Sequence, residues 1–131
     1  MSEPGSVGVT NGQLTPCPPS PNCVCSQIAK DDAVHFIEPL NYNCPEEEIN
    51  EIVSSVIDAY PRTKIVTQNN NYYHVEFKTL IFRFVDDVEI LIDDTNKSVH
   101  FRSASRIGYS DLGTNRKRVE ALKAKISGKL K

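Results

Sequence analysis

The sequence predicts a two-layer α+β domain: a mainly antiparallel sheet of about five or six strands with two helices on one face. Apolar residues recur at helical spacing in two segments, over 45–59 and 112–127. Between them, residues 63–103 contain several short segments that are rich in β-branched and aromatic side chains. With 131 residues, 39% of them hydrophobic, the chain is long enough for one hydrophobic core rather than two.

The N-terminal part divides into a polar tail and a segment rich in proline and cysteine. Residues 1–13 carry too few apolar side chains to fold, so we expect a flexible tail followed by a single domain over 14–131. The segment LTPCPPSPNCVCSQ (14–27) has four prolines, which exclude a helix or a strand inside a sheet. We expect it to lie extended across a surface. Residues 33–40 alternate weakly and predict a short edge strand.

Two helices are predicted, over 45–59 and 112–127. The first starts near Pro45, has acidic residues in its first turn, and carries one apolar stripe formed by Ile49, Ile52, Val53, Val56 and Ile57. The stripe of the second contains Leu112, Val119, Leu122 and Ile126, and Asn115 lies on it. Burying an unpaired amide costs about 1 to 3 kcal/mol, so we expect Asn115 to bond to the backbone of a loop or strand beneath the helix.

The strands are predicted between the helices. TKIVTQ (63–68) and YYHVEFK (72–78) flank three asparagines, which favours a hairpin. Residues 79–103 supply two or three more strands, with a turn at DDTNKS (93–98). In the segment 72–78, alternation puts Tyr73, Val75 and Phe77 on one face and His74, Glu76 and Lys78 on the other. The sheet should therefore have one apolar face and one more polar face.

Charge is unevenly distributed along the chain, although the net charge is only −2. Residues 1–100 contain 6 Lys or Arg against 15 Asp or Glu, a charge of −9, and residues 101–131 contain 9 against 2, a charge of +7. A basic C-terminal element could attract an anionic small molecule or surface, or it could complement the acidic body, which we favour. Nucleic acid is not expected as a partner, because no aromatic residue interleaves with the basic residues of 116–131.

The segment FRSASRIGYSDLGTNRKRVE (101–120) has an unusual density of polar groups. With Ser110 or Asp111 as N-cap of the second helix, the positive helix end could bind an anion together with nearby arginines. The same groups could instead anchor the helix to the sheet, which we favour. The candidate ligand-binding residues are Arg102, Ser103, Ser105, Arg106, Tyr109, Ser110, Asp111, Asn115 and Arg118.

A carboxylate cluster and two serines support a weaker enzymatic alternative. Asp86, Asp87 and Glu89 offer too few ligands for Mg²⁺ or Ca²⁺, so we expect them to pair with Arg102 or Arg106 and fix the last helix to the sheet. Ser103 or Ser105 could form a triad with His100 and Asp111. However, no nucleophile elbow surrounds either serine, and alternation points His100 away from the core. We therefore expect a non-enzymatic binding or structural domain without a metal or cofactor.

Four cysteines leave the redox state open. The spacing of Cys17, Cys23, Cys25 and Cys44 lacks the paired C-x2-4-C pattern of structural zinc sites. In an oxidising compartment, Cys17 and Cys23 could form a disulfide that closes a proline-rich loop. In a reducing compartment, all four would be ordinary thiols.

The sequence has no segment that predicts a transmembrane helix or a signal peptide. No apolar run approaches the roughly 20 residues that span a bilayer, and the N-terminus lacks a basic and a hydrophobic region. We expect a soluble monomer, cytoplasmic if Met1 is the native start. If a leader has been removed, the compartment would be the cell envelope or the exterior.

Three ordered segments resemble the domain of unknown function 1499 family: LTPCPPSPNCVCSQ, FRFVDDVEILID and VHFRSASRIGYSDLGTNRKRVEAL. The resemblance extends from about Leu14 to Ile126. It implies no established activity, and many members look membrane-anchored or exported. The family's characteristic positions would fall on Cys17, Pro18, Ser20, Pro21, Asn22, Cys23, Ser26, Asp86, Asp87, Glu89, Arg102, Ser103, Ser105, Arg106, Gly108, Asp111, Gly113, Asn115 and Arg118. Cys25 stands where the family implies a serine, and Cys44 is additional.

Overall fold

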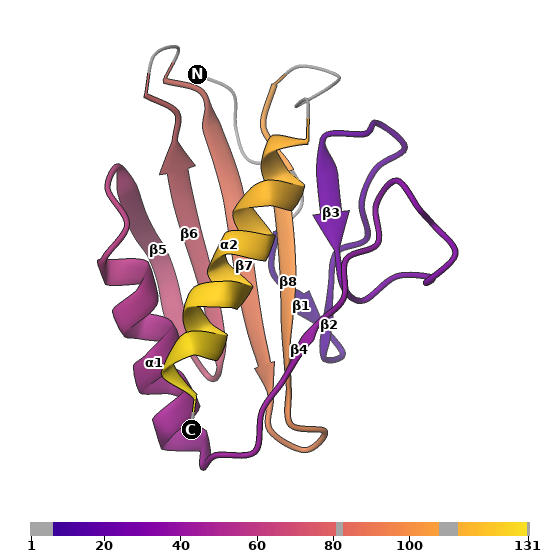
Figure 1. The fold of residues 1–131 in the computed structure, drawn as a ribbon. Coiled ribbons are helices and arrows are strands. Elements are labelled where there is room, and N and C mark those ends of the chain that lie inside the picture. Colours follow the sequence, from indigo (N-terminus) through magenta and orange to yellow (C-terminus); the bar gives the residue numbers. More distant parts are fainter. Residues whose placement is uncertain (1–6, 81–82, 108–112, 131) are drawn as a thin grey trace.

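Two helices lie on one face of a six-stranded sheet in the computed structural model, which describes residues 7–80, 83–107 and 113–130 (Figure 1). The elements in chain order are β1 (Val9–Thr10), β2 (Gln13–Leu14), β3 (Cys23–Cys25), β4 (Leu40–Asn41), α1 (Glu46–Asp58), β5 (Thr63–Asn69), β6 (Tyr72–Lys78), β7 (Val85–Asp93), β8 (Ser98–Ser105) and α2 (Thr114–Lys129). The sheet has the order β3-β8-β7-β6-β5, with β4 also paired to β8, and all of these pairs are antiparallel. The predicted α+β architecture is confirmed.

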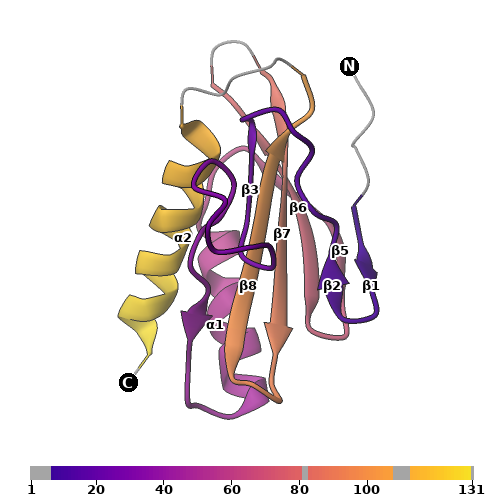
Figure 2. The same ribbon diagram turned by 90° about the vertical axis from the view of Figure 1, so that its right-hand side faces the viewer.

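The sheet has two distinct faces. The helix face packs against α1 and α2 and carries most of the hydrophobic core, whereas the far face is partly covered by the hairpin β1–β2 (Figure 2). Strand β7 is buried on both faces except at Asp93. No helix in the described ranges is long and apolar enough to cross a membrane.

Helix α1 begins after Pro45 and ends at Asp58, within one residue of the prediction at each end. Three glutamates in its first turn lie at the positive end of the helix dipole, which stabilises them there. The apolar stripe predicted for this helix is buried against the sheet: Ile49, Ile52, Val53, Val56 and Ile57.

Helix α2 starts two residues later than predicted, at Thr114. Its N-cap is Gly113, which has a left-handed φ of 81° that glycine adopts at little cost. The prediction of Ser110 or Asp111 as N-cap was therefore wrong; these two residues and Leu112 lie outside the described residues. The rest of the predicted stripe is buried, including Asn115, which is 0% exposed.

The β5–β6 and β7–β8 hairpins form where the sequence predicts them. Asn70 and Asn71 turn β5 into β6 with positive φ values of 48° and 67°, which asparagine tolerates better than most residues. Residues 79–103 supply two strands, β7 and most of β8, in register over eight residue pairs.

The N-terminal third departs from the sequence predictions. Of the strand predicted over 33–40, only Leu40 belongs to a strand, β4, and Phe36 forms an isolated bridge with Cys25. The reason is a turn: the Asp32 carboxylate accepts the backbone N–H of His35, and the Asp32 carbonyl accepts that of Phe36. Conversely, the proline-rich segment contains a buried edge strand, β3.

The segment predicted as a tail contributes to the hairpin β1–β2. The hairpin turns at Asn11 and Gly12, both with positive φ, as the Asn-Gly pair favours. Leu14 of this hairpin packs in a small cluster with Cys25 and Leu91 on the far face. The flexibility of residues 1–13 as a whole stays a prediction.

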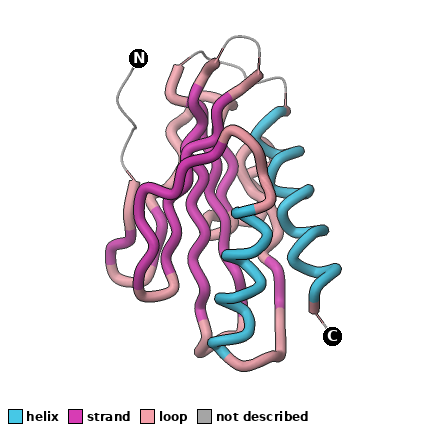
Figure 3. The backbone as a smooth tube through the Cα atoms, turned by 90° about the vertical axis from the view of Figure 1, so that its left-hand side faces the viewer, coloured by secondary structure: helices cyan, strands magenta, loops and turns pink. Residues whose placement is uncertain are grey.

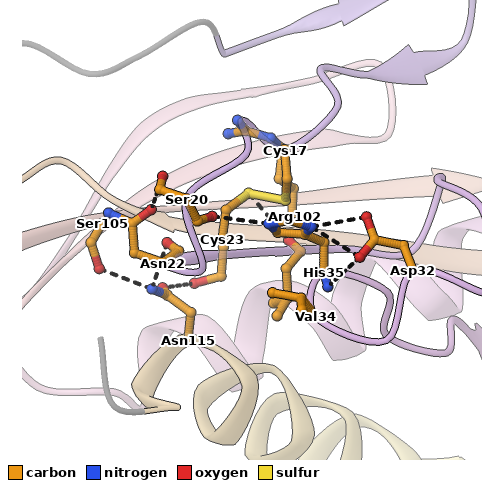
Figure 4. The surroundings of a disulfide bond; sticks show 12 residues. Cys17, Ser20, Asn22, Cys23, Asp32, Val34, His35, Arg102, Ser105 and Asn115 are labelled. Carbon is orange, nitrogen blue, oxygen red and sulfur yellow. Dashed lines mark hydrogen bonds and ion pairs between the residues drawn. A yellow bond between two sulfur atoms is a disulfide. The ribbon is translucent and has the colours of Figure 1, made fainter. Parts of the chain in front are cut away.

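A disulfide joins Cys17 to Cys23, whose Cα atoms are 5.7 Å apart (Figure 4). Cys25 and Cys44 are free thiols. The disulfide closes a loop of residues 17–23. This loop is bonded to β8, since the backbone N–H of Ser105 donates to the carbonyl oxygen of Asn22 at 3.0 Å. We call residues 17–23 the disulfide loop.

His35 holds the disulfide loop from its other side (Figure 4). Its Nε2 lies 2.9 Å from the carbonyl oxygen of Ser20, and its Nδ1 lies 2.9 Å from a carboxylate oxygen of Asp32. Both neighbours can only accept, so the protonated imidazole satisfies both. Burial opposes protonation, but the bonds to Ser20 and Asp32 outweigh it and raise the pKa of His35 above its ordinary 6.5.

Removing the disulfide is expected to lower the free energy of unfolding by about 2 kcal/mol, because the short loop then regains conformational entropy in the unfolded chain. Urea unfolding of wild type with and without reductant measures the difference. A Cys17→Ser/Cys23→Ser variant should match the reduced wild type and should not respond to reductant. Equal stability of the oxidised and reduced wild type would contradict this expectation.

The protonation of His35 is expected to stabilise the fold at acidic pH. Because the folded pKa is raised, this contribution is fully present below the unfolded value of about 6.5 and is lost as pH rises through the folded pKa. An NMR titration of the imidazole signals measures the pKa of His35 in the folded protein. His100 is an internal control, since burial lowers its pKa. Titration of His35 at or below the pKa of His100 would rule out the proposed protonation.

Candidate functional site

The predicted site residues lie on both faces of the sheet, because successive side chains of β8 point to opposite sides. Ser103 faces the helices, whereas Arg102 points to the far face, where it pairs with Glu89. The six described members of the predicted ligand-binding set are therefore divided between the two faces of the sheet. Between α2 and the sheet, Ser103 and Ser105 of β8 meet Asn115 and Arg118 of α2. Arg102 and Arg106 lie on the far face. The remaining three, Tyr109, Ser110 and Asp111, lie outside the described residues.

Asn115 is the centre of a group of hydrogen-bonded polar side chains between α2 and the sheet. Its Oδ1 accepts from Ser103 Oγ at 2.5 Å and from Arg118 Nη1 at 3.3 Å. Its Nδ2 donates to Ser105 Oγ at 2.9 Å and to the carbonyl oxygen of Asn22 at 3.2 Å (Figure 4). One buried amide thus connects α2 with β8 and with the disulfide loop.

Arg118 extends this group to the next strand. Its Nη1 donates to Asp86 on β7 at 2.6 Å, and its guanidinium lies 5.1 Å from the ring centre of Phe77. Asp86 was expected to pair with Arg102 or Arg106; it faces the helices instead and pairs with α2 directly. We call Ser103, Ser105, Asn115, Arg118 and Asp86 the helix anchor.

Arg106 is the centre of a second charged group, on the far face. Its Nε lies 2.9 Å from Asp87 Oδ2, and its Nη2 lies 2.6 Å from Glu76 Oε2. His74 Nε2 is 2.7 Å from the other oxygen of Asp87. Burial would raise the pKa of Asp87, but hydrogen bonds from His74 and Arg106 outweigh this effect and hold it below its ordinary value. The carboxylate is therefore ionised and already fully engaged.

Glu89 is the centre of the adjacent group on the far face and is 0% exposed. One of its oxygens accepts from Tyr72 Oη at 2.6 Å and from the backbone N–H of Gly8 at 2.7 Å, and the other lies 3.3 Å from Arg102 Nη1. The Nε of Arg102 is buried and has no hydrogen-bonding partner within the described part of the chain. Burial and the neighbouring Glu89 raise the pKa of Tyr72.

The geometry does not assemble the enzymatic arrangements that the sequence allows. Ser103 lies under α2, whereas His100 bonds to Ser26 on the opposite face at 2.8 Å, so these residues cannot form a triad. The carboxylate cluster is also divided, since Asp86 faces the helices and Asp87 and Glu89 face away. In the ranges that the structure describes, no three His, Cys, Asp or Glu side chains are grouped to hold a metal ion.

A polar groove of about 570 Å³ lies elsewhere, between α1 and the β5–β6 hairpin. Figure 3 shows the side of the molecule on which these elements lie. The groove is lined by Asn50, Glu51, Ser54, Ser55, Asp58, Gln68, Asn69, Asn70, Asn71 and Tyr73. We call this feature the amide groove.

Sequence reasoning missed several residues of the far-face charged groups and of the amide groove. Alternation along β6 placed His74 and Glu76 on the more polar face, which was a usable signal, but their pairing with Arg106 depends on the strand register. The contact of Gly8 with Glu89 joins residues 81 positions apart and had no sequence signal. The amide groove was marked only by the three asparagines of the predicted turn.

Comparison with known proteins identifies the family. No curated protein matches the chain. The sequence profile described as "Protein of unknown function (DUF1499)" matches residues 13–126, which include β2 to β8 and most of α2. The chain therefore belongs to the DUF1499 family of proteins of unknown function.

Proposed function

We propose that this chain is a non-enzymatic binding or structural domain in which the Arg/Ser-rich segment, residues 101–120, serves as a structural anchor. The supporting observation is the bonding of Asn115, which uses both ends of its buried amide to join α2, β8 and the disulfide loop. The side chains of Ser103, Ser105, Asn115 and Arg118 are thereby occupied within the fold. The enzymatic alternative, through Asp86, Asp87 and Glu89 or through Ser103 and Ser105, has no comparable support.

The same proposal places the domain in an oxidising compartment. Disulfides persist in the cell envelope and outside the cell, whereas cytosolic thiols are kept reduced in most organisms. The Cys17–Cys23 disulfide supports this location, because it requires an oxidising environment to persist. It closes the loop whose Asn22 carbonyl accepts a hydrogen bond from Asn115.

Anion binding at Arg102 is a second candidate, which one observation favours. The buried Nε of Arg102 lacks a partner within the described residues, and an unpaired buried donor is costly. An anion that accepted this hydrogen would remove the cost. Against it, Arg102 already pairs with Glu89, and Arg106 with two carboxylates.

Replacement of the anchor amide tests the main proposal. Asn115→Leu is expected to lower the free energy of unfolding by about 1 to 3 kcal/mol, because the groups bonded to the amide lose their partner. Urea unfolding gives the free energy, and far-ultraviolet circular dichroism shows whether α2 is retained. Lys117→Leu, at an exposed position of the same helix, should change stability by less than about 0.5 kcal/mol. Equal effects of the two substitutions would refute the anchor.

The response to sulfate separates the two candidates. An anion site at Arg102 would raise the melting temperature of wild type in sulfate but not that of Arg102→Gln. If Arg102 is only a structural residue, as we expect, sulfate should raise both melting temperatures equally. Differential scanning fluorimetry measures both, with sodium chloride at matched ionic strength as the control.

A further inference from the structure

We infer that the amide groove binds a neutral polyhydroxylated ligand, of which a short oligosaccharide is the clearest example. This inference rests on the proposed function, since it supplies the ligand site of the binding domain. The groove volume of about 570 Å³ is within the roughly 300 to 1,000 Å³ of ligand pockets. Its walls come from α1 on one side and from β5, β6 and their turn on the other.

The chemistry of the groove matches hydroxyl groups. Eight of its ten lining residues end in an amide or a hydroxyl, which can both donate and accept hydrogen bonds. Sugar hydroxyls also donate and accept, so each can be satisfied by such a neighbour. No aliphatic side chain lines the groove, but carbon atoms of its polar side chains form part of the surface and can contact the C–H groups of a sugar ring.

The charge of the groove excludes anions. Its two ionisable acids, Glu51 and Asp58, are exposed carboxylates, and no Lys or Arg is among the lining residues. Phosphates, nucleotides and acidic sugars would therefore be repelled. Carboxylates can accept from sugar hydroxyls, so the same two residues favour a neutral polyol.

The floor of the groove is rigid before any ligand binds. Asn50 Nδ2 donates to Asn71 Oδ1 at 2.8 Å, and Asn50 Oδ1 accepts from Tyr73 Oη at 2.6 Å. Asn71 Nδ2 in turn donates to Glu46 Oε2 at 2.7 Å, and the carbonyl of Asn71 accepts the backbone N–H of Ile92. These bonds fix the turn against α1, so little ordering is required on binding.

The rim of the groove carries polar side chains that are available to a ligand. Those of Glu51, Gln68 and Asn70 are exposed, and they form no hydrogen bond or ion pair with other described residues. They come from α1, from β5 and from the turn, so a ligand in the groove could contact all three elements. The bonded floor fixes the shape of the groove, and the rim supplies donors and acceptors for a hydrophilic ligand.

The test is NMR titration of ¹⁵N-labelled full-length protein with maltose, cellobiose and N,N′-diacetylchitobiose, at concentrations that detect a Kd of about 1 mM. At least one sugar is expected to shift backbone amide signals of residues 50–58 and 68–73, with the rest of the spectrum unchanged. Inorganic phosphate should not shift these signals. Spermidine tests whether the carboxylates instead attract a cation.

Variants locate the binding site. Glu51→Ala combined with Gln68→Ala should weaken sugar binding about tenfold, since two hydrogen-bonding side chains are lost. The matched control, Glu47→Ala combined with Gln13→Ala, removes the same two exposed residue types outside the groove and should bind as wild type does. Asn70→Gly, which keeps the positive φ of the turn, should also weaken binding.

The outcomes separate this inference from the proposed function. No shift with any sugar, shifts outside the groove, or binding of spermidine alone would overturn the inference and leave the helix anchor unaffected. Cleavage of a sugar, visible in its own proton spectrum, would overturn the non-enzymatic function as well. The inference and the binding function would both be supported by shifts confined to the groove residues, provided that the double variant reduces them and the matched control keeps them.

Discussion

The hydrogen bonds of one buried amide, that of Asn115, determine how the C-terminal helix and the N-terminal loop meet the sheet. Three strand or loop groups and one arginine converge on it. An apolar side chain at this position would still pack between α2 and the sheet, but it would leave the buried Ser103 hydroxyl without its acceptor. An unpaired buried group is costly, so the amide specifies one arrangement of α2 rather than simply adding buried area.

Around this amide, strand alternation places the polar side chains of β7 and β8 on opposite faces of the sheet. On the helix face, Asp86 is bonded by Arg118 of α2; on the far face, Asp87 and Glu89 are bonded by arginines of β8 and its continuation. Adjacent carboxylates therefore have different roles: Asp86 joins α2 to the sheet, whereas Asp87 and Glu89 join β7 to β8 and its continuation. Buried ion pairs are weak evidence for stability because desolvation offsets the attraction, but loss of one partner would leave a buried charge. This division explains how the fold accommodates so many charged groups in adjacent positions of two strands.

The sequence was informative wherever local patterns decide structure. Helix α1, both central hairpins and the burial of Asn115 follow from periodicity and turn residues, which act within a few positions of the chain. Prediction failed where distant contacts decide. The strand β3 exists because β8 offers it an edge, and the expected strand at 33–40 gives way to a turn closed by Asp32. The described residues of the predicted anion site are divided between two faces, because they were grouped by sequence proximity although neighbours in a strand point to opposite sides.

The bond between Asn115 and Asn22 also has a consequence for the order in which the chain folds. The two residues are 93 positions apart, so the bond requires the closure of a very large loop. The β5–β6 and β7–β8 hairpins close over a few residues and can form early. The two ends of the domain can join only after this central meander exists as a template. We therefore expect the disulfide loop and α2 to close the structure late, and a chain released before its last helix is complete to expose an unfinished core.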